Sequence, residues 1–130
     1  QKKEKPLPPL EFMSSDGFRI LVGRNNVQND ILTLKTAKNY DMWLHVQKQA
    51  GSHTIIVADN KEITETAIYE AACIAAYHSK SKDSSSVAVD YTIIKNIKKP
   101  VGAKPGKVIY NTYNTLYVTP QKDLIEKLIK

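Results

Sequence analysis

The segment TIIVADNKEITETAIYEAACIAAYHS, residues 54–79, decides the fold that this sequence predicts. Its first part, Thr54–Ala58, is rich in β-branched apolar residues, which is typical of a strand buried at the centre of a sheet. Its second part, Thr64–Ser79, has the apolar spacing of a helix, with Thr64 at the N-cap. The stripe of this helix consists of Ala67, Ala71, Ile74, Ala75 and His78. Because alanine side chains are small, we expect this helix to pack closely on the sheet.

A hairpin and a further strand are predicted before this segment. The strands Glu11–Ser14 and Phe18–Gly23 flank the pair Asp16-Gly17, which tolerates the positive φ of a tight turn. Residues Met42–Val46 form another strand, because apolar side chains alternate along it. These strands precede the predicted central strand in the sequence, and we expect them to join the same sheet.

Residues Asn26–Ala37 are predicted to form a second helix. Val27, Ile31 and Leu34 fall at helical spacing, so we expect them to face the core. An asparagine at position 25 or 26 can cap this helix, because its side-chain oxygen accepts a hydrogen bond from a free backbone N–H.

The C-terminal part completes an α+β fold. Its expected strands are Val87–Ile97, Lys107–Tyr110 and Leu116–Thr119, and a short helix follows Pro120. The prediction is a single domain over residues 11–130, with a mostly antiparallel sheet packed with two main helices and a short C-terminal helix. Residues 1–10 are charged and Pro-rich, as expected of the end of a linker.

Composition narrows the class of function. A chain of 130 residues with 42% hydrophobic and 25% charged residues suits one globular domain. Its net charge of +6 favours polyanionic partners such as RNA or DNA. The single cysteine, Cys73, excludes an internal disulfide and a cysteine-type zinc finger. No apolar run suits membrane insertion. Because Gln1 is not a methionine, we expect a piece of a longer protein.

The first candidate site lies at the turn into the second helix. Helix N-termini offer unpaired N–H groups that suit phosphate, and Arg24 adds a guanidinium there. The amides of Asn25, Asn26 and Asn29 can contact sugars or base edges, or they can cap the helix and tie down loops.

The second candidate site combines aromatic and titratable residues. Asp41, Trp43 and His45 point to one side of a strand, and His53 follows after a turn. Trp43 can stack on a base while both histidines form hydrogen bonds. A buried Asp–His pair is the structural alternative, and a hydrolase or nuclease is the catalytic one. Two histidines without a third ligand do not make a zinc site, and no complete catalytic triad is present, so we expect no metal, no cofactor and no enzyme.

The third candidate site is a basic loop shaped by glycine and proline. Such loops commonly follow phosphate backbones, although lysine also makes surface loops soluble. Its lysines, with no acid among them, are Lys95, Lys98, Lys99, Lys104 and Lys107.

These segments together resemble the NFACT-R domain, the C-terminal module of the bacterial NFACT family. The similar motifs are Asp16-Gly17-Phe18 through Asn26, Gln28-Asn29-Asp30, Asp41-x-Trp43-x-His45, Gly51-Ser52-His53, Val89-Asp90-Tyr91-Thr92 and Gly102-Ala-Lys-Pro-Gly106. They occur in the order of the family and span residues 11–119, which makes the resemblance far more specific than any one motif.

The resemblance implies a module that binds RNA and the ribosome. Proteins of this family act on stalled large ribosomal subunits, hold tRNA and promote C-terminal alanine tailing of nascent chains. Their tRNA-selecting residues lie largely in an N-terminal domain, so tailing itself is not assigned to these residues. The expected partners are the large ribosomal subunit and tRNA, in the cytoplasm. The same proteins carry the name fibronectin-binding protein, and the alternative is an adhesin module for fibronectin at the cell surface.

Overall fold

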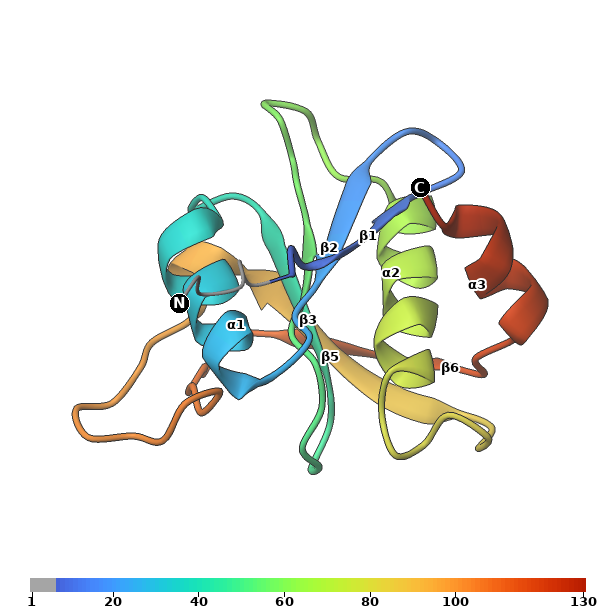
Figure 1. Ribbon diagram of the computed structural model, residues 1–130. Coiled ribbons are helices and arrows are strands. Elements are labelled where there is room, and N and C mark those ends of the chain that lie inside the picture. Colours follow the sequence, from blue (N-terminus) through green and yellow to red (C-terminus); the bar gives the residue numbers. More distant parts are fainter. Residues whose placement is uncertain (1–6) are drawn as a thin grey trace, which may run out of the picture.

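Six strands form one antiparallel sheet in the computed structural model, which describes residues 7–130 (Figure 1). The order across the sheet is β1-β2-β4-β3-β5-β6, and each neighbouring pair is antiparallel. The strands are β1 (Leu10–Met13), β2 (Arg19–Val22), β3 (Met42–Val46), β4 (Thr54–Ile56), β5 (Val87–Ile93) and β6 (Asn114–Val118). The α+β prediction and the interior position of residues 54–56 are therefore confirmed. Of the predicted linker end, residues 1–6 lie outside the described part.

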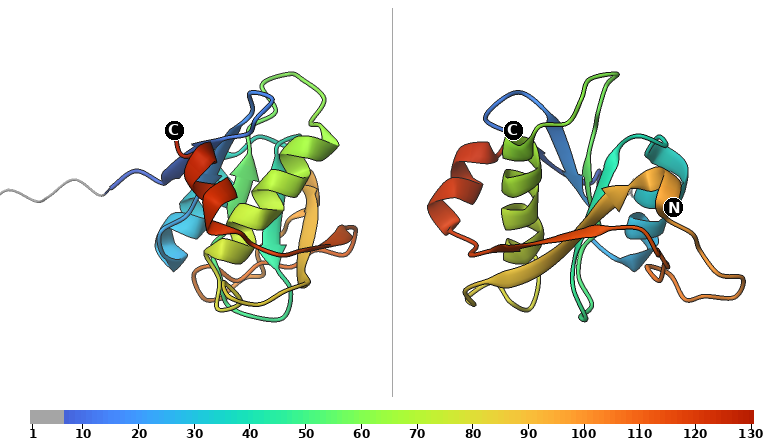
Figure 2. Two further views of the ribbon diagram at one scale, coloured as in Figure 1. Left: turned by 90° about the vertical axis from the view of Figure 1, so that its right-hand side faces the viewer. Right: turned by 180° about the vertical axis from the view of Figure 1, so that it is seen from behind.

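One face of the sheet is covered by α2 (Glu65–Tyr77). Thr64 caps this helix, because its hydroxyl oxygen accepts a hydrogen bond from the Ala67 N–H at 3.1 Å. Most of the predicted stripe is buried against the sheet, as expected for small side chains that allow close approach. α3 (Lys122–Leu128) packs beside α2 (Figure 2), and its Ile125 and Leu128 are buried in the same core.

The other face of the sheet carries α1 (Asn26–Ile31), which continues directly into a π-helical turn, η1 (Leu32–Thr36). A second, smaller core forms here between the sheet and the two helical segments. Its buried members are Leu21, Leu32, Trp43, Ile55 and Ile94. The sheet is therefore buried on both faces, by different helices (Figure 1).

The predicted core face of the second helix is wrong. Val27, Ile31 and Leu34 are 61%, 48% and 40% exposed. Asn29, Leu32 and Thr33 are buried instead. The physical reason is hydrogen bonding, because both Asn29 and Thr33 bond to His53 in the interior. The π-helical turn also changes the helical spacing before Leu34 is reached.

The predicted strands near the basic loop are shorter than expected. β5 ends at Ile93, and residues Ile94–Asn96 form a 3-10 turn (η2). Residues 107–110 form no strand, although Lys98 and Ile109 exchange two backbone hydrogen bonds of 2.9 and 2.7 Å. Prolines and positive-φ glycines in this segment interrupt regular pairing. No helix among residues 7–130 is long and apolar enough to cross a membrane.

The inverted helix face can be tested with two neighbouring residues. Leu32 is 1% exposed and Ile31 is 48% exposed. We expect Leu32→Ala to lower the free energy of unfolding by about 3 kcal/mol, because it leaves a cavity in the second core. We expect Ile31→Ala to lower it by less than about 1 kcal/mol. Urea unfolding followed by circular dichroism measures both, and a larger loss for Ile31→Ala would restore the sequence-based orientation.

Candidate nucleic-acid interface

The three candidate segments meet around His53, which is 1% exposed. Its Nε2 lies 3.0 Å from the carbonyl oxygen of Gly106, and its Nδ1 lies 2.7 Å from the hydroxyl of Thr33. Since a carbonyl can only accept, Nε2 carries the proton and Nδ1 accepts from Thr33. Burial lowers the pKa of His53 to about 4, and the neighbouring His45 acts in the same direction. His53 is therefore a neutral bridge between the helical segment and the basic loop.

Asp30 forms a second link between α1 and the basic loop. Its Oδ1 accepts the Gly106 N–H at 2.9 Å, and its carboxylate pairs with the Lys99 ammonium at 3.2 Å. Lys99 also donates to the backbone carbonyls of Lys104 and Lys107, at 2.7 and 3.1 Å. The ammonium of Lys99 is thus engaged inside the protein, which corrects the view of it as a free phosphate-binding group.

The asparagines at the start of α1 have separate positions. Asn25 caps the helix by accepting the Gln28 N–H at 2.8 Å, and Asn26 is exposed beside Gly106. Asn29 is 2% exposed, and its Oδ1 accepts the His53 N–H at 3.1 Å. A Cβ on Gly23 would lie 1.9 Å from that oxygen, so glycine is required there. Asn29 is therefore a structural residue, which corrects its predicted place at the RNA-facing surface.

Five predicted cations remain exposed. None has a carboxylate partner within 4.0 Å among the described residues. They are Arg24, Lys95, Lys98, Lys104 and Lys107. Arg24 is oriented by its Nε, which donates to the Pro8 carbonyl at 2.6 Å. We call these five side chains the basic surface.

Trp43 does not offer a stacking platform. It is 1% exposed, and its ring packs parallel to His45 with centroids 5.5 Å apart. Tyr110 covers it from another side at 4.8 Å. The predicted exposed stacking face is therefore wrong, because the indole belongs to the second core. Asp41 does not join this group, since its carboxylate accepts the backbone N–H groups of Lys38 and Ala58, each at 2.9 Å.

Sequence reasoning missed the residues that hold Tyr110. Asp90 is 3% exposed and accepts hydrogen bonds from the Tyr110 and Thr115 hydroxyls, both at 2.7 Å, and from Gln47 at 2.9 Å. Burial, and then the bond to Asp90, raises the pKa of Tyr110 above its usual range. The sequence signal that could have revealed them is Asp90, a carboxylate within an apolar strand. A buried carboxylate requires hydrogen-bond partners.

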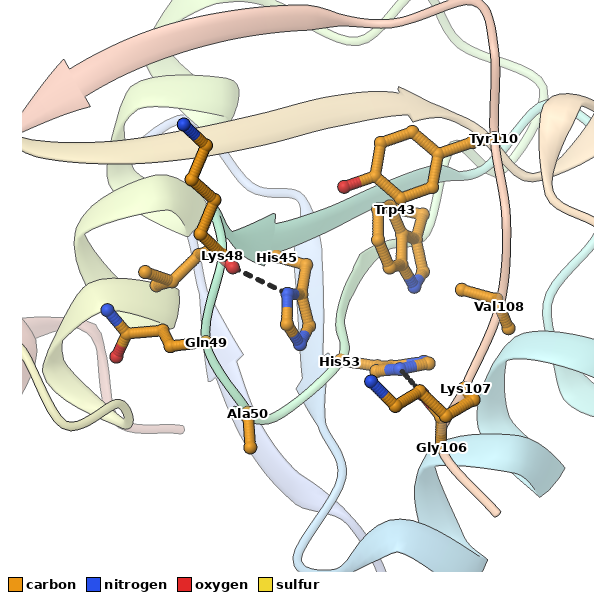
Figure 3. Close-up of a pocket in the computed structure, with 11 residues that line it drawn as sticks. Trp43, His45, Lys48, Gln49, Ala50, His53, Gly106, Lys107, Val108 and Tyr110 are labelled. Atoms are coloured by element: carbon orange, nitrogen blue, oxygen red, sulfur yellow. Dashed lines mark hydrogen bonds between the residues drawn. The ribbon is translucent and has the colours of Figure 1, made fainter. Parts of the chain in front are cut away.

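A cavity of about 530 Å³ opens beside these rings, between the β3–β4 turn and the basic loop (Figure 3). Its walls include Trp43, His45, His53, Val108 and Tyr110, and its rim includes the exposed Lys48 and Lys107. The indole nitrogen of Trp43 is buried behind this wall and has no hydrogen-bond partner among the described residues (Figure 3). We call this space the Trp43 pocket.

The described residues define a small α+β domain with a set of exposed cations. Residues 9–112 match the family model described as NFACT protein RNA binding domain, and the chain belongs to this family. The resemblance seen in the sequence is therefore confirmed.

Named relatives agree with this membership. The chain is 52% identical over 132 residues to the Rqc2 homolog RqcH of Bacillus subtilis, and 41% identical over 129 residues to that of Streptococcus suis. These alignments cover 100% and 98% of the chain but 23% of each relative, so the chain spans about a quarter of their length. The archaeal Rqc2 homolog aRqcH of Methanocaldococcus jannaschii is 24% identical over 95 residues, which cover 73% of the chain and 14% of that protein.

A solved structure has the same fold. It is described as the C-terminal of the fibronectin/fibrinogen-binding protein from Streptococcus suis, with a TM-score of 0.93 and 41% sequence identity. The match covers 100% of this chain and 52% of that one.

The neutral state of His53 predicts a pH dependence of stability. Its pKa is about 4 in the folded chain and near 6.5 when unfolded, so the unfolded chain binds more protons between these values. The contribution is complete above pH 6.5 and is lost as pH falls toward 4, by about 3 kcal/mol. Urea unfolding at a series of pH values measures this loss.

A histidine substitution identifies the source of that slope. We expect His53→Gln to make the slope between pH 6.5 and 4 less steep, and the half-buried His45, whose pKa is also lowered, to supply part of the slope that remains. His78→Gln, on the α2 side of the sheet, is the matched control and should keep the slope. An unchanged slope in His53→Gln would contradict the neutral bridge.

Proposed function

We propose that this chain is the RNA-contacting domain of a ribosome-associated quality-control factor, and that the basic surface binds the phosphate backbone. The observation that carries the proposal is the set of five exposed cations without carboxylate partners among residues 7–130. Phosphate contacts by lysine and arginine supply most of the affinity in sequence-independent nucleic-acid binding. Membership in an RNA-binding domain family supports the choice of RNA.

The order of the basic loop also supports this proposal. Asp30, Lys99 and His53 hold the loop through Gly106 and neighbouring carbonyls. A loop held in advance loses less conformational entropy when it binds. Lys104 and Lys107 are therefore presented on a braced backbone.

The role of the whole protein is proposed from its relatives. In this proposal the longer protein acts on stalled large ribosomal subunits with tRNA, in the cytoplasm, and promotes alanine tailing of nascent chains. The present domain supplies RNA contacts and no catalytic group. The names of the relatives, Rqc2 homologs, support this role.

A second candidate is an adhesin module that binds fibronectin at the cell surface. The observation in its favour is the fold likeness to a protein described as fibronectin/fibrinogen-binding. The sheet has β6 at one edge, and an extended peptide can add to such an edge by strand pairing. Binding of this kind would not depend on the basic surface.

Paired charge removals test the RNA proposal. Arg24→Ala with Lys104→Ala removes two cations of the basic surface, whereas Lys122→Ala with Lys127→Ala removes two exposed cations of α3, on the far side of the molecule (Figure 1). We expect the first variant to bind tRNA and large ribosomal subunits about tenfold more weakly at moderate salt. The slope of log affinity against log salt should become less steep by about 1.5. The control variant should bind like the parent chain.

Binding to fibronectin is measured with the same variants. Salt-independent RNA binding, or equal losses in both variants, would contradict the basic surface as the RNA site. Saturable fibronectin binding that survives loss of the basic surface, without RNA binding, would favour the second candidate.

A further inference from the structure

A small cleft lies within the basic surface, between residues 95–98 and residues 109–112. Its volume is about 270 Å³, and two lysines of the basic surface, Lys95 and Lys98, line it together with polar residues. The two segments are fixed to each other, because Lys98 and Ile109 exchange backbone hydrogen bonds of 2.9 and 2.7 Å. We call this space the Lys95 cleft.

An exposed tyrosine lies next to this cleft, just before β3. Tyr40 is 66% exposed, and the Lys95 ammonium lies over its ring, 5.9 Å from the centroid. The backbone N–H of Lys95 also donates to the Asn39 carbonyl at 2.9 Å, so the segment that bears Tyr40 is held beside the cleft. The ring is therefore placed next to a cation while most of its side chain stays open to solvent.

A second exposed tyrosine lies just before β6. Tyr113 is 45% exposed, and its ring packs edge-on against the ring of Tyr110, which lines the cleft, with centroids 5.1 Å apart. Antiparallel pairing of β3 with β5 and of β5 with β6 brings the starts of β3 and β6 to the same end of the sheet, with the end of β5 between them. Two strand spacings amount to about 10 Å, so Tyr40 and Tyr113 flank the Lys95 cleft.

Exposed aromatic rings beside unpaired cations suit single-stranded nucleic acid. Unpaired bases stack on such rings, and lysines contact the phosphates between them. In a duplex the bases are stacked on one another, so a duplex can reach the lysines but not the rings. Neither Lys95 nor Lys98 has a carboxylate within 4.0 Å among the described residues, so both ammonium groups are available to phosphate.

We propose that Tyr40 and Tyr113 are base-stacking platforms for an unpaired stretch of the bound RNA. Lys95 and Lys98, in the cleft between them, bind its phosphates. This inference rests on the proposed RNA-binding function and adds to it a preference for single strands. It assigns the aromatic contact, which burial prevents at Trp43, to two exposed rings. Because every base has a face that can stack, we expect little dependence on RNA sequence.

Three ligands of equal length separate stacking from charge. They are a short single-stranded RNA, the same strand in a duplex, and an abasic strand that keeps the phosphates but has no bases. We expect the parent chain to bind the single strand more than about tenfold more tightly than the abasic strand, because only the single strand can stack. Fluorescence anisotropy of labelled ligands measures the affinities. Since a duplex carries more charge, its affinity is compared only between variants.

Four variants separate the rings from the lysines. Tyr40→Ala and Tyr113→Ala should each weaken binding of the single strand about tenfold, with no change for the abasic strand or the duplex and an unchanged salt slope. Tyr40→Phe keeps the ring and should restore the binding that Tyr40→Ala loses. Lys98→Ala should weaken binding of all three ligands and make the salt slope less steep by about 1. Tyr69→Ala removes a 48% exposed ring from α2, and this matched control should bind as the parent does.

The outcomes distinguish this inference from the proposed function. If RNA binds with salt sensitivity but Tyr40→Ala and Tyr113→Ala bind the single strand as the parent does, the stacking inference is wrong and the basic surface stands. Equal losses for the single strand and the abasic strand would mean that the rings act only through the lysines, which would also overturn the inference. Failure of all three ligands to bind would overturn the proposed function first.

Discussion

The arrangement of this domain depends on one buried, neutral imidazole. His53 accepts from Thr33 on one ring nitrogen and donates to Gly106 on the other, while its backbone N–H is bonded to Asn29. Three segments distant in the sequence are thereby fixed to one another. A protonated His53 could not accept from Thr33, and burial, the largest cause of the low pKa of His53, favours the same neutral form.

This constraint explains the unusual orientation of α1. The helix turns Asn29 and Thr33 inward because their hydrogen-bonding groups are needed at His53, and Gly23 leaves room for the amide. Val27 and Ile31 consequently face solvent. Burying those two side chains would have stabilised the helix through apolar area, but it would have left His53 with unpaired polar atoms. Leaving one buried polar group unpaired and leaving one apolar side chain unburied cost similar amounts of free energy.

The parts of the fold that follow from local pattern were predictable. The hairpin around Gly17, the central strand at residues 54–56 and the capped helix α2 depend on turn chemistry, β-branching and apolar spacing within a few residues. The orientation of α1 was not predictable in this way, because it is set by a partner 20 to 24 residues away. The candidate site shows the same division. Exposed lysines follow from composition, whereas the burial of Trp43 and the engagement of Lys99 depend on contacts across the fold.

The same network relates the basic surface to the Trp43 pocket. Gly106 donates its N–H to Asp30 and accepts from His53 at its carbonyl, so one residue fixes both the loop that bears Lys104 and the rim that bears Lys107. Gly106 has φ +83 and its Cβ position adjoins Asn26, so a side chain there would disturb both. Phosphate contacts of Lys104 and Lys107 would then be made at one fixed spacing, because a single residue holds the backbone that carries both. A backbone held in advance in this way loses less conformational entropy when it binds a polyanion.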